Sequence, residues 1–244
     1  MKKVILGAAL CSAAVALAGP ATADGSSDFL SGSTGALVLG STGIPTPDAG
    51  YITGAESLYL DPSGYDGTAA STLALTTPES YDFTSSVTQG EQDLVNAVVA
   101  DYEAGDMGCN AVGVCSDPLT IFTYSQSSAI AALAEQQLAD DKIPTDALRL
   151  VMTGADPLGV PDNLYPTEVF NIDGDFWAEP GASGATTDDI LFGMVLHFAY
   201  LWLDPAEIDS ATQVVDGLTT LNDIPTLTTT QLIEALLTAY SAGF

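Results

Sequence analysis

A strand-like run that ends at one serine and continues at once as a helix-like run constrains this chain more than any other feature. Residues 119–124 are rich in β-branched and aromatic types, and an alanine-rich pattern occupies residues 127–139. A sharp strand-to-helix turn of this kind lifts a serine hydroxyl above a parallel sheet, the arrangement called a nucleophile elbow. The pattern therefore predicts a buried strand, a tight turn at Ser125 and a helix packed behind the strand.

Further apolar runs alternate with helix-like segments along the chain. Strands are expected over residues 36–40, 147–153 and 168–172, and helices over residues 87–102, 187–203 and 229–241. Residues 57–60 fit a short strand or a helix end, and residues 61–80, rich in Ser, Thr, Gly and Pro, fit irregular surface. Because strands alternate with helices, the sequence predicts an α/β-hydrolase fold, with a central, mostly parallel sheet and helices on both faces.

The N-terminus has the layout of a secretory signal peptide. Two lysines at residues 2–3 precede an apolar run over residues 4–18, which is too short to span a bilayer, and an A-x-A site ends at Ala23. We expect cleavage after Ala23, a flexible lead-in over residues 24–35, and a single domain over residues 36–244 with a helical C-terminal part. The mature protein is expected to be secreted or held in the cell envelope.

Two of the three cysteines, Cys109 and Cys115, lie outside the predicted signal peptide. Two cysteines six residues apart in an exported chain are expected to form a disulfide. No further cysteine or nearby histidine could complete a coordination shell around them, so we predict neither a metal site nor a cofactor.

The chain is strongly acidic, with 32 Asp and Glu against 4 Lys and Arg. Loss of the signal peptide would leave Lys142 and Arg149 as the only fixed cations. Such a surface repels nucleic acid and anionic lipid head groups, so no nucleic-acid partner is expected. Solubility or tolerance of salt explains the charge, and loose binding of divalent cations is the alternative. With 47% apolar residues, the chain is not of the disordered class.

A serine hydroxyl becomes a nucleophile only when a base takes its proton and a third group orients that base. His197 is the one histidine of the chain, and it follows Ser125, as the order nucleophile, acid, histidine requires. Between them, Asp173 and Asp175 come directly after an apolar strand-like run, at the edge of a parallel sheet where sites form. We predict Ser125 as nucleophile, His197 as base and Asp175 as acid, with Asp173 as the alternative acid.

The developing oxyanion needs backbone donors. One is expected from Gln126, directly after the nucleophile. The other is expected from Ser41 or Thr42, in a loop whose flanking glycines allow close approach of backbone to substrate.

Each of these residues also has a purely structural interpretation. Ser125 or Ser127 could cap the following helix, and the two aspartates could form an Asx turn. His197 lies within an apolar run, residues 191–203, and could be a satisfied core residue. That run is too short to span a membrane, and we expect it to be buried against the sheet; lining an acyl pocket or forming a lid is the alternative.

Several short motifs together resemble the PE-PPE domain family, mycobacterial-type serine α/β-hydrolases akin to cutinases. The resemblance covers roughly residues 36–200. Two motifs are specific together: a glycine-threonine-glycine loop with paired prolines in residues 36–47, and Thr123-Tyr124-Ser125-Gln126-Ser127, similar to the family's G-x-S-x-S elbow. Weaker matches are Thr77-Pro78-Glu79, residues 87–101, Gly174-Asp175-Phe176, and His197 with Tyr200.

The resemblance implies ester chemistry. Family members are esterases or lipases of short to medium acyl esters, and some are acyltransferases that build cell-envelope glycolipids; both use an acyl-serine intermediate. A small-molecule or lipid ester is therefore the expected partner, with contact to cell-envelope lipids as a further expectation, and the sequence leaves the oligomeric state unassigned. Thr123 departs from the family's first elbow glycine. A non-catalytic acidic envelope protein on the same fold is accordingly the alternative to an enzyme.

Overall fold

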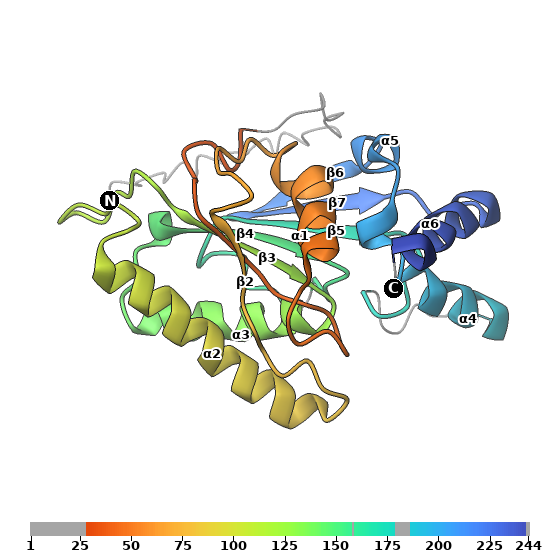
Figure 1. Cartoon of the computed structure of the whole chain (residues 1–244), viewed down its shortest axis with the longest axis horizontal. Helices are drawn as coiled ribbons and strands as arrows, with labels where there is room; N and C mark the ends of the chain where they lie inside the picture. The colour runs from red at the N-terminus through yellow and green to blue at the C-terminus, as the bar shows by residue number, and fades with distance from the viewer. Residues whose placement is uncertain (1–27, 158, 179–185, 243–244) are drawn as a thin grey trace, which may run out of the picture.

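The centre of the protein is a seven-stranded sheet with helices packed against both faces (Figure 1). This is a computed structural model, and it describes residues 28–157, 159–178 and 186–242. The strand order is β2-β1-β3-β4-β5-β7-β6, and every neighbouring pair is parallel except the hairpin of β6 and β7. The strands are β1 (Ala36–Val38), β2 (Thr72–Ala74), β3 (Leu119–Tyr124), β4 (Leu148–Thr153), β5 (Thr167–Ile172), β6 (Thr212–Asp216) and β7 (Thr219–Ile224). The predicted α/β class and mostly parallel sheet are confirmed.

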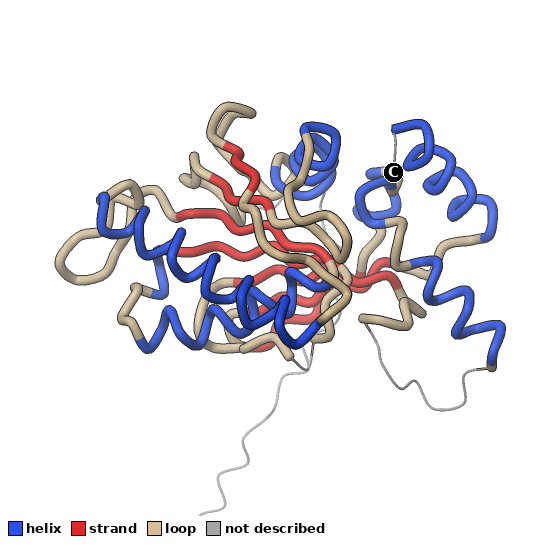
Figure 2. Tube along the Cα trace, turned by 60° about the horizontal axis from the view of Figure 1, so that its bottom comes forward, coloured by secondary structure: helices blue, strands red, loops and turns tan. Residues whose placement is uncertain are grey.

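Two apolar cores lie on opposite faces of the sheet. Residues of β3 alternate between them: Ile121 packs into the core under α2 (Phe83–Ala104) and α3 (Gln126–Asp140), and Phe122 packs into the other. Figure 2 shows α2 and α3 side by side on one face. The second core gathers side chains from α1 (Ala49–Ala55), the 3₁₀ turn η3 (Tyr200–Trp202) and α6 (Thr229–Ala242). All six residues of β3 are buried, as expected for a central parallel strand covered on both sides.

The structure differs from the sequence predictions mainly at the sheet edges. Residues 61–80, expected to be irregular, contain the edge strand β2, and the C-terminal part, expected to be helical, contains the β6–β7 hairpin. These edge strands are short or largely exposed, so backbone pairing with a neighbour forms them without a strong apolar pattern. Residues 57–60 belong to a π-helical turn (Glu56–Leu60), so they end a helix and form no strand.

The expected helix over residues 187–203 is also interrupted. Helix α4 spans Thr187–Leu196, and a turn separates it from η3. His197 is the residue that ends α4, so its side chain is carried at a bend in the chain and not in the middle of a helix.

The N-terminal region is described only from Asp28 onward, so the predicted signal peptide lies outside the described residues. The described part of the expected flexible lead-in is packed onto the domain. Leu30 and Ser33 are fully buried, and the Thr34 backbone N–H donates to Asp117 Oδ1 at 2.8 Å. The apolar side chain of Leu30 joins the core, which explains the difference from the sequence prediction.

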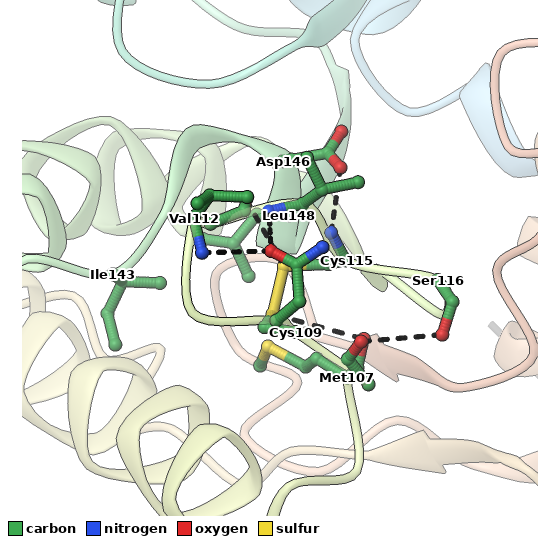
Figure 3. Close-up of a disulfide and its surroundings, with 12 residues drawn as sticks. Met107, Cys109, Val112, Cys115, Ser116, Ile143, Asp146 and Leu148 are labelled. Atoms are coloured by element: carbon green, nitrogen blue, oxygen red, sulfur yellow. Dashed lines mark hydrogen bonds between the residues drawn. A yellow bond between two sulfur atoms is a disulfide. The ribbon is translucent and has the colours of Figure 1, made fainter.

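The predicted disulfide joins Cys109 and Cys115 in the loop between α2 and β3 (Figure 3). The same two residues form an antiparallel bridge, and the Cys115 backbone N–H donates to Asp146 Oδ2 at 2.9 Å. The loop that leads into β3 is therefore fixed both within itself and to the turn before β4. Within the described residues, no helix combines the length and apolarity that crossing a bilayer requires.

One buried carboxyl group is unusual. Glu135 lies on α3 and is fully buried, and neither of its carboxyl oxygens has a hydrogen-bond partner within the described chain. Burial penalises the charged form and raises the pKa of Glu135 to about 8 from 4.5.

The raised pKa of Glu135 predicts that the folded protein loses stability as the pH rises. Between pH 4.5 and about 8 the unfolded chain has lost the Glu135 proton while the folded chain keeps it. The unfolded state thus binds fewer protons, and the free energy of unfolding falls as the pH rises through this interval. We expect Glu135→Gln to unfold at a higher temperature than the wild type at pH 8, and at a similar temperature near pH 4.5. Thermal unfolding of both proteins across this range measures the effect, and parallel curves would contradict it.

Candidate active site

Ser125 occupies the turn between β3 and α3. Its backbone angles are φ 63° and ψ −119°, a strained conformation for a residue other than glycine, of the kind that gathers at active sites. The Ser125 N–H donates to the carbonyl of Thr153 at the end of β4, at 3.0 Å. Ser125 stands at the N-cap position of α3, but its side chain makes no capping hydrogen bond, so the hydroxyl is not used to cap the helix.

Two neighbouring residues hold this turn. Ser127 Oγ accepts from the Tyr124 N–H at 2.9 Å and donates to the Tyr124 carbonyl at 3.0 Å. Thr123, which replaces a glycine of the family pattern, is fully buried, and its hydroxyl pairs with that of Ser128 at 3.0 Å. A β-branched residue is therefore accommodated here because a small, polar partner faces it from α3.

The structure brings Ser125, His197 and Asp175 into one hydrogen-bonded chain. Ser125 Oγ lies 2.8 Å from His197 Nε2, and His197 Nδ1 lies 2.7 Å from Asp175 Oδ2. Asp175 is fully buried and His197 nearly so. Since a carboxylate only accepts, Nδ1 carries the proton, which leaves Nε2 free to accept from the serine hydroxyl. His197 is thus buried, as its apolar surroundings in the sequence indicate, with both ring nitrogens bonded to polar side chains.

The buried carboxylate of Asp175 has three donors. Besides His197, the Tyr200 hydroxyl donates to Oδ2 at 2.8 Å and the Trp177 N–H donates to Oδ1 at 2.9 Å. A buried charge is tolerated only when it is satisfied in this way. Burial raises the pKa of Tyr200 well above its ordinary value, as does the charge of Asp175, so its hydroxyl remains a donor.

Tyr200 also belongs to the site, because its hydroxyl bonds to Asp175, and the sequence alone does not assign it this role. Its hydroxyl also accepts from the Ile172 N–H at 2.9 Å, and its carbonyl accepts from the Tyr59 hydroxyl at 2.8 Å. The sequence signal is its place three residues after the only histidine, which puts both side chains on the same side of the bend.

Asp173, the alternative acid, does not reach His197. It is exposed, and Thr226 Oγ1 donates to its Oδ2 at 3.0 Å. Residues 173 and 175 leave β5 through a turn in which only Asp175 points to the interior. Of the two candidates, Asp175 is therefore the one with a geometry suited to orient an imidazole.

Two glycines allow the close packing of these parts. A Cβ atom at Gly193 of α4 would lie 2.3 Å from the Gly174 carbonyl oxygen, next to the turn that holds Asp175. A Cβ atom at Gly154 would lie 2.9 Å from His197 Cε1. Side chains at these positions would push α4 and the imidazole away from the sheet.

The triad opens onto an apolar cavity of about 590 Å³. Ser41, Thr42 and Gln126 line it together with Ser125, and no hydrogen bond within the described residues uses their backbone N–H groups. The predicted oxyanion donors thus lie around the same cavity as the serine. Its apolar wall comes mainly from small and aromatic side chains, including Ala129, Ala132, Leu133, Val160, Trp177 and Phe198.

The apolar run 191–203 divides between the core and this cavity. Leu196, Leu201 and Leu203 are buried against the sheet, whereas Phe198 is 61% exposed and lines the cavity. The run therefore packs mainly against the sheet, as expected, and its role as an acyl pocket or a lid stays a prediction. In the described part of the chain, no cluster of His, Cys, Asp and Glu could hold a metal ion.

Comparison with known proteins finds a family whose model matches part of this chain. The PE-PPE domain model matches residues 62–163. An uncharacterised PPE family protein of Mycobacterium tuberculosis, PPE28, is 30% identical over 213 residues, which cover 72% of this chain. The chain spans only 30% of the length of that relative. No solved structure matches significantly. This chain therefore matches the PE-PPE domain family over residues 62–163.

Proposed function

We propose that this protein is an exported serine hydrolase that acts on carboxylic esters through an acyl-serine intermediate. The observation that carries the proposal is the hydrogen-bonded chain from Ser125 through His197 to the buried Asp175, at the wall of an apolar cavity. The domain family is lipase-like in general, which supports the same chemistry. The chain spans only a small part of its curated relative, so the proposed activity and substrate concern this chain and are not taken from that relative.

The geometry suits a two-step acyl transfer. As Ser125 Oγ attacks the ester carbonyl, His197 Nε2 takes the hydroxyl proton, and Asp175 stabilises the resulting imidazolium. Gln126, Ser41 and Thr42 line the same cavity, and the N–H of Gln126 with that of Ser41 or Thr42 would bind the oxyanion. When the intermediate collapses, His197 gives its proton to the departing alcohol. Water then attacks acyl-Ser125, with His197 again as base, and releases the carboxylic acid.

The substrate suited to this cavity is an uncharged ester. Among the described residues that line it there is no Lys or Arg, Asp156 is acidic, and the protein as a whole is strongly acidic. Anionic acyl or alcohol groups are therefore repelled both at a distance and at the site. A sugar hydroxyl could attack the same acyl-serine in place of water, since both acceptors need only the same base.

A fluorophosphonate probe tests the proposal directly. The purified protein is expected to react with one equivalent of probe, and peptide mass mapping should place the adduct on Ser125. An uncharged p-nitrophenyl ester should protect against labelling and be hydrolysed. Absence of labelling, or an adduct on another residue, would favour the non-catalytic alternative. Following the acyl group with a sugar acceptor present then separates hydrolysis from acyl transfer.

A further inference from the structure

The two backbone segments proposed to bind the oxyanion are linked through one short stretch, Glu79–Ser80. The N–H of Gly43, in the loop of Ser41 and Thr42, donates to the Glu79 carbonyl at 2.7 Å. On the other side, Gln126 Nε2 donates to the Ser80 carbonyl at 3.0 Å. One dipeptide thus contacts both the loop after β1 and the first residue of α3.

A closed ring of hydrogen bonds fixes the Gln126 side chain. The Ser80 N–H donates to Ser86 Oγ at 2.9 Å, Ser86 Oγ donates to Gln126 Oε1 at 2.9 Å, and Gln126 Nε2 returns to the Ser80 carbonyl. Each donor finds one acceptor, which determines the orientation of the amide. Ser86 is 1% exposed and Gln126 3% exposed, so water does not compete for these bonds.

Glu79 has the strain expected of a positioning element. Its φ is 42°, in the left-handed region that residues with a side chain rarely adopt, and it is 1% exposed. Thr77 Oγ1 donates to Glu79 Oε1 at 2.8 Å, which holds the side chain inward. Strain of this kind persists only where surrounding contacts over-determine it.

We propose that Glu79, Ser80 and Ser86 form a clamp that sets the spacing between the two oxyanion-binding segments. The clamp rests on the proposed function, and its members are positioning residues that touch no substrate. Because the donors must meet a charge that exists only in the transition state, loosening the clamp lowers kcat and leaves KM nearly unchanged.

Ser86→Ala tests the clamp, because it removes the hydroxyl that closes the ring. We expect kcat for an uncharged ester to fall by about 10-fold to 100-fold, with KM within about 2-fold. Ser86→Thr keeps the hydroxyl and is expected to retain most of the activity. Gln126→Met should lower kcat similarly, and the double variant should be no worse than the poorer single one, because both break the same ring.

Ser33→Ala is the matched control. Ser33 is fully buried and its hydroxyl pairs with Thr120 Oγ1 at 2.6 Å, near the start of β3 and away from the cavity. It should lose stability as Ser86→Ala does while keeping kcat. Equal kcat in Ser86→Ala and wild type, or equal losses in Ser86→Ala and Ser33→Ala, would overturn the clamp.

Amide hydrogen exchange tests the clamp without relying on catalytic activity. In Ser86→Ala, peptides containing Gly43 and Gln126 should exchange faster than in wild type, and in Ser33→Ala they should not. If the wild type neither hydrolyses esters nor reacts with the probe, the proposed function fails while this measurement still decides whether the clamp exists. Unchanged exchange in both peptides would contradict it.

Discussion

Ser125→Ala is expected to lower kcat for ester hydrolysis by about 10⁶-fold, the size of loss seen when a serine nucleophile is removed from a working triad. Without Oγ no acyl-enzyme forms, and the base has no proton to take. Alanine tolerates the backbone of this turn about as well as serine does, so the fold should survive. Steady-state kinetics on an uncharged ester, together with thermal unfolding, measure both effects.

The control for this substitution lies within the site. Ser128 lines the same cavity, and its hydroxyl pairs with Thr123 and donates to the Thr153 carbonyl, whereas the hydrogen bonds of the His197 ring go to Ser125 and Asp175. Ser128→Ala is expected to keep most of kcat while losing about 1 kcal/mol of stability. A Ser125→Ala protein that hydrolyses esters at a rate within tenfold of wild type would show that Ser125 is not the nucleophile.

Asp175→Asn is expected to lower kcat by about 10⁴-fold. An amide at this position has the wrong hydrogen-bonding pattern to hold His197 with its proton on Nδ1, and it carries no charge to stabilise the imidazolium. The Tyr200 hydroxyl and the Trp177 N–H, which now bond to Asp175, would keep the side chain in place. The loss should therefore appear in kcat with little change in the unfolding temperature.

Asp173→Asn is the matched comparison, two residues away. Its carboxylate is exposed and bonds to Thr226, so the same change of charge to amide should leave kcat within about 2-fold of wild type. Equal effects of the two substitutions would mean that the charge of this turn matters and the contact with His197 does not.

The sequence predicts the centre of this structure well. An apolar run followed directly by an alanine-rich one predicts strand β3, the turn at Ser125 and helix α3. The proximity of Asp175 and His197 to Ser125 follows from chain order, strand-end placement and the presence of one histidine. Buried parallel strands have strong apolar signals because both of their faces are covered.

What the sequence does not predict depends on contacts between distant residues. The sequence ranks Asp175 ahead of Asp173 as the acid, but only the structure shows which carboxylate faces the interior after β5. The pairing of Tyr200 with Asp175 needs the bend at the end of α4. Strand β2 and the β6–β7 hairpin form by pairing with existing edges, so their own residues carry little pattern. The packing of Thr123 against Ser128 likewise requires knowledge of the facing helix.

The strand order has a consequence for what counts as the smallest working unit of this protein. The loop of Ser41 and Thr42 follows β1, Ser125 follows β3 and Asp175 follows β5. In the sheet, β1 and β5 lie on opposite sides of β3. The segment matched by the family model, residues 62–163, includes Ser125 and Gln126 and excludes Ser41, Asp175 and His197. A polypeptide cut to that segment would carry the serine without its base or its acid, and β2, β3 and β4 would lack both β1, which separates β2 from β3, and β5, which pairs with β4. Strand pairing therefore places the residues of the proposed site well outside residues 62–163, the stretch that the family model matches.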